Sequence, residues 1–368
     1  MQKSFLNVQY ISSILFFFAF ILLSCSDNRE DSRHAVYKDI INSTYPGEFR
    51  KIAVEEAEPI EITMDESSVE LADKIHADLT DFEVADGYIY LTDIAGHRII
   101  RVHEANKSIE FFGREGRGPG EFNRPSEINA NSEYLFVLDS RNSRIQVFNK
   151  EMEMIHAIAR NYRGFLDVTE NVLLVPDLTR LEESVVVTYS ADPPFVKTGE
   201  FMPRLVPLGE QPLVINGVII RSDTIGRIYV SYIGLPFILV FDDELNHLDS
   251  IELTGLYVAN FYDRPPERAS DYLQREEVVR HFKRWFAVKD HLLFMGVRGD
   301  LIVIDLESNQ LVANYKLRIG DRPLAHKTGK IFGEKLYLLD QMNSRMVRIS
   351  LDMDNDGDEL FKNVDILF

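Results

Sequence analysis

The stretch IYLTDIAGHRIIRV, residues 89–102, decides the fold, because the chain repeats its pattern twice more. The other copies are LFVLDSRNSRIQVF, residues 135–148, and LYLLDQMNSRMVRI, residues 336–349. Each copy joins an apolar run ending in aspartate to a second apolar run that follows an arginine five residues later. Two short apolar runs on either side of a polar turn are typical of antiparallel β-strands.

Apolar runs like the first half of this pattern recur six times, at spacings of 38 to 65 residues. They are Ile89–Asp93, Leu135–Asp139, Leu173–Asp177, Ile228–Tyr232, Leu293–Gly296 and Leu336–Asp340. Further strand signals precede them at residues 82–87 and 286–291, with hairpin turns at Asp86-Gly87 and Asp290-His291, and others follow at residues 109–112 and 248–253. Repeated four-stranded antiparallel units are typical of a propeller. The sequence therefore predicts an all-β, six-bladed β-propeller over residues 46–368.

Two segments depart from the repeat. Residues 59–64 are a spare apolar strand that either completes the last blade and latches the ring, or packs alongside with the rest of residues 48–64. Residues 257–284 form an insertion between blades 4 and 5. There Asp271 and Gln274 resemble a capping box ahead of an apolar stripe, which predicts a helix. This helix either caps blade edges or forms a lid over the axial opening.

Residues 113–125 read GREGRGPGEFNRP. With the three Asp-x4-Arg frames, this run resembles the NHL-like six-bladed propellers, in particular the propeller lipoproteins of the bacteroidete type. The resemblance covers three blades, since blades 3 to 5 lack both features. The glycines predict tight turns between blades, not a phosphate loop, because no Gly-Lys-Ser/Thr and no helix follow. In each frame the aspartate is predicted to cap turn amides and the arginine to pair nearby.

The N-terminus predicts export and lipid anchoring. Residues 11–23 are mostly apolar but fall short of the ~20 residues of a membrane span, so residues 1–24 are interpreted as a signal peptide. Residues 22–25, LLSC, resemble a bacterial lipobox, which makes the single cysteine, Cys25, the lipidation site. Residues 25–45 are interpreted as a tether. Ser26 favours the outer membrane, and the acidic flank at Asp27, Glu30 and Asp31 favours exposure at the cell surface.

Composition excludes some partners. The net charge of −19 argues against nucleic acid, because phosphate backbones are bound by basic surfaces. With 45% hydrophobic residues the chain is globular and neither disordered nor fibrous. We expect a monomer that is held at the membrane by its lipid and contacts an envelope protein or glycan.

Aligned inner strands predict a set of polar residues at the mouth of the propeller channel. The candidates are Asp81, Glu83, Glu127, Asn129, Asp167, Arg221, Arg284 and Trp285. Carboxylates beside the only tryptophan and an arginine could form a pocket for a polar ligand, with the ring stacking on a sugar or amine. The same residues could equally be plain blade packing.

A second candidate site lies near the C-terminus, where Asp352, Asp354, Asp356 and Asp358 have the spacing of a calcium loop. The glutamate expected at position twelve of such a loop is replaced by Asn363. An acidic hairpin turn is therefore the preferred interpretation, and we expect no cofactor, with calcium as the alternative.

Two functions remain open at the level of sequence. The first is a non-enzymatic binding or scaffold propeller that contacts a protein, peptide or glycan, since no GxSxG, HExxH or CxxC motif occurs. The second is a lactonase- or lyase-like enzyme that uses a divalent ion held by Glu83, Glu127, Asn129 and Asp167.

Overall fold

The computed structural model describes most of the chain in two units, residues 1–47 and 48–368. The described residues are 35–54, 59–64, 77–159, 166–178, 181–207, 216–223, 225–233, 235–254, 285–295, 300–324, 326–340, 345–352 and 361–367. In the first unit, residues 35–44 are helical, within the segment that the sequence predicts to be a tether. The predicted signal peptide and Cys25 lie outside the described residues. Among those described, no helix has both the length and the apolar character needed to cross a bilayer.

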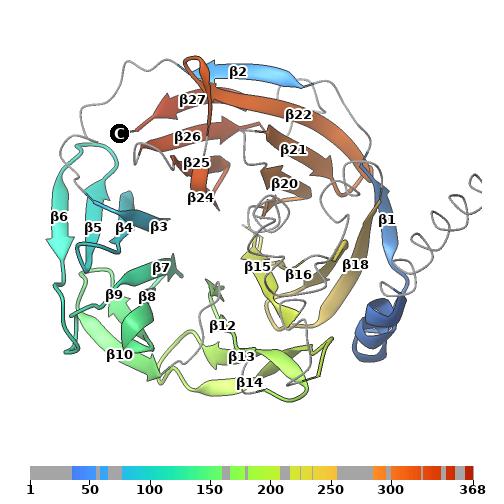
Figure 1. The fold of residues 1–368 in the computed structure, drawn as a ribbon, viewed down its shortest axis with the longest axis horizontal. Helices are drawn as coiled ribbons and strands as arrows, with labels where there is room; N and C mark the ends of the chain where they lie inside the picture. The colour runs from blue at the N-terminus through green and yellow to red at the C-terminus, as the bar shows by residue number, and fades with distance from the viewer. Residues whose placement is uncertain are drawn as a thin grey trace, which may run out of the picture. The chain divides into compact units, whose positions relative to one another are not determined.

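The second unit is a ring of six antiparallel sheets, a six-bladed β-propeller (Figure 1). Blade 1 contains β3 (Leu79–Ala85), β4 (Tyr88–Asp93), β5 (Arg98–His103) and β6 (Ile109–Phe112). Blade 2 contains β7 (Pro125–Ala130), β8 (Tyr134–Asp139), β9 (Arg144–Asn149) and β10 (Met154–Ala159). Blade 3 contains β11 (Asp167–Val168), β12 (Val172–Pro176), β13 (Ser184–Ser190) and β14 (Lys197–Pro203).

The remaining blades repeat this order from the axis outward. Blade 4 contains β15 (Val218–Ser222), β16 (Ile228–Tyr232), β17 (Phe237–Phe241) and β18 (His247–Thr254). Blade 5 contains β19 (Trp285–Val288), β20 (His291–Met295), β21 (Asp300–Asp305) and β22 (Gln310–Ile319), with β23 (Arg322–Pro323) beside β22. Blade 6 contains β24 (His326–Phe332), β25 (Lys335–Asp340), β26 (Met346–Leu351) and β27 (Phe361–Ile366). The six predicted apolar runs are the second strands of the six blades, which confirms the predicted fold.

Local turn chemistry explains the hairpins. Asp86 and Gly87 join β3 to β4 with φ of 51° and 75°, the positive values that a type I′ turn requires. In blade 5 the turn lies one residue earlier than predicted, at Lys289-Asp290, with Lys289 at φ 46°. The insertion of residues 257–284 lies outside the described residues, so its predicted helix stays a prediction.

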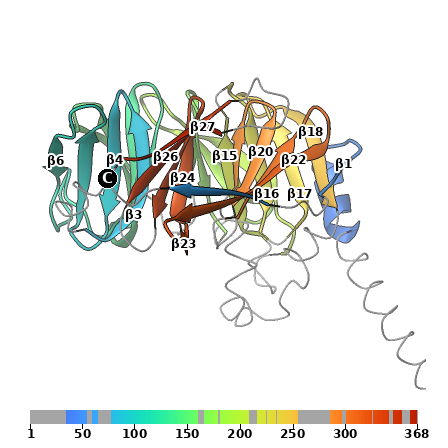
Figure 2. The same ribbon diagram turned by 90° about the horizontal axis from the view of Figure 1, so that it is seen from above.

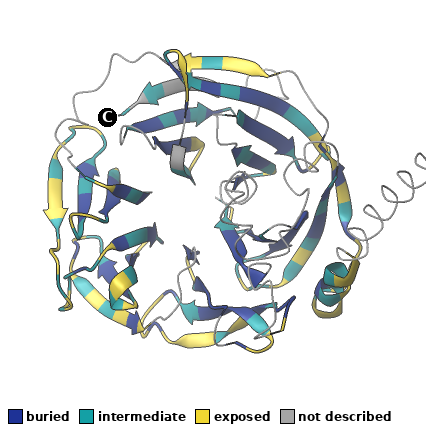
Figure 3. Cartoon of the chain, viewed as in Figure 1, coloured by how far each residue is buried: buried dark blue, intermediate teal, exposed yellow. Residues whose placement is uncertain are grey.

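The hydrophobic core lies between the blades. Side chains alternate along each strand, so each blade turns apolar groups toward both neighbours. At the seam between blades 6 and 1, Tyr337 and Leu339 pack with Leu91 and Ile100, and all four are fully buried. Figure 3 shows the outcome: inner and middle strands are mainly buried, whereas exposed residues gather on outer strands such as β6 and β14.

The N-terminal strands do not latch the ring. β2 (Ile60–Met64) pairs in parallel with β22 on the outside of blade 5, and β1 (Arg50–Ala53) pairs in parallel with β18 on blade 4 (Figures 1 and 2). The outer position of blade 6, which a latch would fill, is taken by β27 from the C-terminus. The interpretation of residues 59–64 as the closing strand is therefore wrong, and their packing alongside is confirmed.

The Asp-x4-Arg frames of blades 1 and 2 are turn caps, as predicted. Asp93 accepts hydrogen bonds from the amide of Gly96 (2.9 Å) and from Nε of Arg98 (2.8 Å). The frame of blade 2 also holds the glycine-rich run, which joins β6 to β7 as predicted. There Arg144 donates to the carbonyl oxygens of Gly118 and Glu121, each at 2.8 Å.

The frame of blade 6 differs from these two. The amide of Asp340 donates to the carbonyl oxygen of Arg345 at 2.8 Å. Two buried nitrogens of Arg345, Nε and Nη1, have no hydrogen-bond partner. Within the described residues, the guanidinium of the third frame therefore does not repeat the cap of the first two.

Candidate functional site

A cavity of about 610 Å³ lies at the axis of the propeller, because the innermost strand of every blade contributes to its wall. The contributing strands are β3, β7, β11, β15, β19 and β24. Its rim is formed by turns that join the first and second strands of blades, and includes Asp86, Ser132, Glu170 and Asp223. The order of strands in each blade therefore places one polar turn after another around one opening.

Carboxylates on the inner strands connect neighbouring blades. Asp81 of blade 1 accepts the amide of Ile128 in blade 2 (3.0 Å). Glu127 of blade 2 accepts the amide of Leu166 ahead of blade 3 (2.9 Å), and Asp167 of blade 3 accepts the amide of Ser222 in blade 4 (3.0 Å). Inner strands are sheet edges with unpaired amides, and these carboxylates satisfy them.

Two further junctions use other donors. Nε of Arg221 in blade 4 donates to the carbonyl oxygen of Trp285 in blade 5 at 3.2 Å. Oγ1 of Thr328 in blade 6 donates to Oδ1 of Asp81 in blade 1 at 3.3 Å. Asp81, Glu127, Asp167 and Arg221 thus connect neighbouring blades and line the cavity at the same time.

The side chain of Lys330, on β24, binds three oxygen atoms of the cavity wall. Its ammonium donates to Oε2 of Glu83 (2.8 Å), to Oδ1 of Asn129 (2.8 Å) and to the carbonyl oxygen of Ile128 (2.5 Å). Burial alone would lower the pKa of Lys330, but Asp81, Glu83 and Asp167 outweigh it and raise the pKa above its ordinary value. The lysine is therefore charged, and it neutralises part of the negative charge of the carboxylates around it.

Burial also shifts the pKa values of acidic and guanidinium groups in the wall. It raises the pKa of Glu83 despite the opposing charge and hydrogen bond of Lys330. It raises the pKa of Asp167 despite Arg221, and it lowers the pKa of Arg221 despite Asp167, Asp81 and Glu127. Perturbed groups that gather in one cavity are a physical signature of a functional site.

Trp285 does not reach the cavity, and its predicted place at the channel mouth is wrong. The indole is fully buried in the core between blades 4 and 5, where its ring packs edge-on to Tyr229 and Nε1 donates to Ser231 at 3.2 Å. Register places a residue on a strand level but leaves open which neighbouring blade its side chain faces. Phe286, the next residue, contributes to the wall instead. Arg284 lies outside the described residues.

Several residues of the site were not among the eight named candidates, and three of them matter most. The inner-strand alignment places Lys330 at the strand level of Glu83 and Asn129, but it was not named as a candidate. Glu170 and Phe332 lie at hairpin turns on the rim, where no sequence motif marks them. Phe332 is 46% exposed and supplies the aromatic surface that the sequence attributes to Trp285.

The lysine bears on the metal-dependent alternative. Two of the four predicted ligands, Glu83 and Asn129, bind its ammonium, so a divalent ion on these oxygens would have to displace a buried cation. The other two, Glu127 and Asp167, accept backbone amides of the next blade. The arrangement therefore fits a wall of fixed charges better than an open metal centre.

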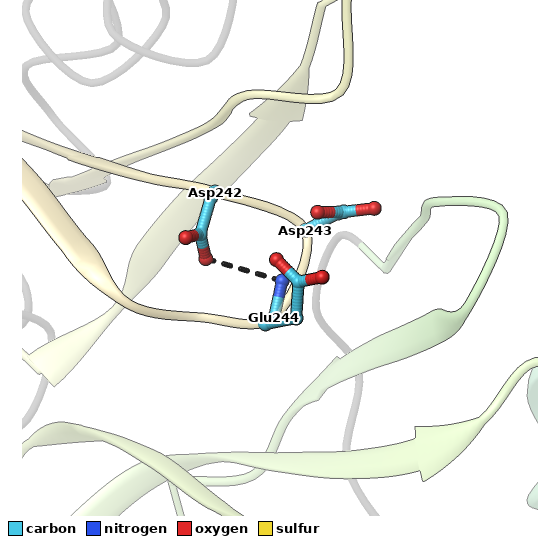
Figure 4. Close-up of side chains that lie close together, drawn as sticks. All are labelled: Asp242, Asp243 and Glu244. Carbon is cyan, nitrogen blue, oxygen red and sulfur yellow. Dashed lines mark hydrogen bonds between the residues drawn. The ribbon is translucent and has the colours of Figure 1, made fainter.

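Among the described residues, one acidic cluster has oxygens close enough together to share an ion: Asp242, Asp243 and Glu244 (Figure 4). They lie in the turn between β17 and β18, where Asp242 and Asp243 are half-buried and Glu244 is exposed. Asp242 accepts the amides of Glu244 (3.1 Å) and Asn246 (2.7 Å), so it caps this turn. Of the predicted calcium ligands, Asp352 follows β26, whereas Asp354, Asp356 and Asp358 lie outside the described residues.

Fold and cavity define a six-bladed β-propeller with a polar axial site. A Bacteroides fragilis protein that is described as expected to be exported matches 82% of this chain and 88% of its own, with 9% identity and a TM-score of 0.53. Virginiamycin B lyase from Staphylococcus aureus matches 74% of this chain and 80% of its own, with 12% identity and a TM-score of 0.44. The WD40 repeats of RRP9 match 79% and 80%, with 9% identity and a TM-score of 0.45. No family model and no curated protein matches the chain.

Proposed function

We propose that this chain is a lipid-anchored binding propeller of the cell envelope, of the NHL-like bacteroidete type, that takes part of a peptide or glycan partner into its axial cavity. The observation that carries the proposal is the cavity of about 610 Å³. This volume lies in the range of ligand pockets in proteins, roughly 300–1,000 Å³. Its polar groups are already held by hydrogen bonds between blades, so a ligand meets an ordered wall and little ordering entropy is lost on binding.

The binding role is preferred over metal-dependent hydrolysis because of Lys330. Its ammonium fills the space between Glu83 and Asn129, and three acceptors bind it. A rigid wall whose charged groups are held in place by hydrogen bonds to the protein can recognise a ligand by shape and charge without a reacting group.

A cavity-filling variant tests the binding role. Ala130 lines the cavity and also packs against the core between blades 1 and 2, so Ala130→Trp should fill part of the cavity, and its circular dichroism spectrum and melting temperature are compared with those of the wild type to show that it still folds. The full chain is incubated with low-mass solutes from a digested cell-envelope extract and analysed by native mass spectrometry. We expect an adduct on the wild type that is lost in Ala130→Trp.

The matched control is Ala157→Trp, on the exposed outer strand of the same blade, which should keep the adduct. Absence of any adduct on the wild type, or equal adducts on all three proteins, would contradict the proposed function.

Anchoring is tested separately at Cys25, whose place after an apolar signal supports lipidation. We expect the wild type to sediment with membranes and to incorporate radiolabelled palmitate. Cys25→Ser should lose the label and shift to the soluble fraction, whereas Ser26→Ala should keep both properties. A labelled or sedimenting Cys25→Ser protein would show that another feature attaches the chain.

A further inference from the structure

The wall of the axial cavity carries more negative than positive groups. Its carboxylates are Asp81, Glu83, Asp86, Glu127, Asp167, Glu170 and Asp223, and its cations are Lys150, Arg221 and Lys330. The whole chain adds to this excess with its net charge of −19. A concave wall of one dominant sign concentrates counter-ions of the opposite sign.

The cations of the wall are already bound by protein acceptors. An ammonium has three N–H donors, and Lys330 uses them on Glu83, Asn129 and the carbonyl oxygen of Ile128. Lys150 donates to the carbonyl oxygen of Asn131 at 2.8 Å and lies 3.5 Å from Asp86. Arg221 donates to two carbonyl oxygens, those of Trp285 and Ile220. An anionic ligand would therefore compete with bonds that the fold has already made.

The carboxylates of the rim are more open to a ligand. Oε2 of Glu170 accepts from Ser132 through its hydroxyl (2.6 Å) and its amide (3.2 Å), and the residue is exposed. The side chain of Asp86 is 61% exposed. A carboxylate offers about four lone-pair directions, so these groups can accept further N–H donors.

An apolar surface lies on the same rim. Phe332 ends β24, is 46% exposed, and lines the cavity together with Ile331. An exposed aromatic ring beside carboxylates suits a cation on an alkyl chain, because the ring attracts the charge through its face and covers the methylene groups.

We infer that the cavity recognises an alkylammonium group, such as that of a lysine side chain or a polyamine. This inference rests on the proposed function and names the class of its ligand. The acceptors of the ammonium are the rim carboxylates, Asp86 or Glu170, and the alkyl chain packs on the apolar part of the rim that includes Phe332. Lys330, which is bound deeper in the wall by carboxylate and carbonyl oxygens, shows the chemistry that the wall offers to such a group.

Isothermal titration of the full chain with three five-carbon probes tests the inference. Cadaverine carries two ammonium groups, 1,5-pentanediol is neutral, and glutarate carries two carboxylates. We expect binding of cadaverine alone, weakened several-fold between 20 and 200 mM salt because ions screen exposed charges. Nα-acetyl-lysine-N-methylamide is the fourth probe, and tighter binding of it than of cadaverine assigns the ammonium to a peptide.

Variants locate the binding. Glu170→Gln and Asp86→Asn should each weaken cadaverine binding, by up to about tenfold, since each removes one of the rim charges that attract the diamine. Ala130→Trp should abolish binding. The control Glu307→Gln removes a carboxylate from the exposed turn after β21 and should leave affinity unchanged.

The outcomes separate this inference from the proposed function. Binding of glutarate or the diol but not cadaverine, lost in Ala130→Trp, would overturn the ligand class and keep the cavity as a binding site. Cadaverine binding that Glu170→Gln and Asp86→Asn leave unchanged would overturn the inference. A third outcome would also overturn it: no probe binds, although the wild type takes up an envelope adduct that Ala130→Trp abolishes. In that case the proposed function would stand without this ligand class.

Discussion

Replacing Asp139 by alanine is expected to lower the free energy of unfolding by about 3–5 kcal/mol, as measured by urea unfolding, because it leaves a largely buried arginine without its counter-charge. The carboxylate of Asp139 is fully buried and lies 2.8 Å from Nε of Arg144, whose side chain is 16% exposed. It also accepts from the amide of Asn123 (2.6 Å) and from Nδ2 of Asn142 (2.8 Å). One side chain thus holds both the turn of blade 2 and the end of the glycine-rich run.

Two further variants control this prediction. Asp139→Asn keeps an acceptor and should lose less than the alanine variant. Glu244→Ala removes an exposed carboxylate from the turn of Figure 4, and a surface change of this kind should alter the free energy of unfolding by no more than about 0.5 kcal/mol. If Asp139→Ala stayed within 1 kcal/mol of the wild type, the cap would not stabilise the blade as argued.

Lys330→Met is expected to cost about 3 kcal/mol at pH 8 and clearly less near pH 4.5, because it removes the cation that stabilises a buried carboxylate. Burial already raises the pKa of Glu83, and loss of Lys330 should raise it further. A carboxyl group with a raised pKa in the folded state contributes stability below its ordinary value of 4.5, and that contribution is lost as the pH rises through the folded-state pKa. Unfolding followed from pH 4 to pH 8 measures the difference.

The double variant Lys330→Met/Glu83→Gln isolates the pair. Removing both charges should recover part of the loss and flatten its pH dependence, since no buried charge is then left alone. Lys197→Met breaks an exposed pair with Glu200, whose side chains are 50% and 40% exposed, and should cost well under about 1 kcal/mol. A loss in Lys330→Met that is the same at both pH values would show that Glu83 does not depend on the lysine for its charge.

The blades could be predicted because their signals are local. An apolar run of five residues, the Asp86-Gly87 turn and the aspartate cap before Arg98 each act within a few residues along the chain. Six copies of such signals predict six sheets, and the ring follows because each sheet has two apolar faces to bury. Blades 3 to 5 lack the frames, yet their strands follow the same alternation.

The candidate site could be predicted only in part. Asp81, Glu83, Glu127, Asn129, Asp167 and Arg221 line the cavity, since they lie on inner strands that the repeat defines. The hydrogen bonds between these residues and neighbouring blades join positions that are far apart in the sequence. Trp285 lies on the same kind of strand but packs into the seam with blade 4, because a strand turns successive side chains toward opposite faces.

Sequence by itself determined the six repeats, their strands and hairpin turns, and the acidic character of the inner strands, because periodicity and turn chemistry are properties of neighbouring residues. It also predicts the anchor at Cys25. Only the tertiary structure decided which partners meet. Lys330 binds Glu83 across 247 residues of sequence, and β2 pairs with β22 although the chain passes through four blades between them. The contact of Lys330 with Glu83 depends on closing the ring, which brings the first blade beside the last, and both contacts join residues too far apart in the sequence for a local pattern to encode them.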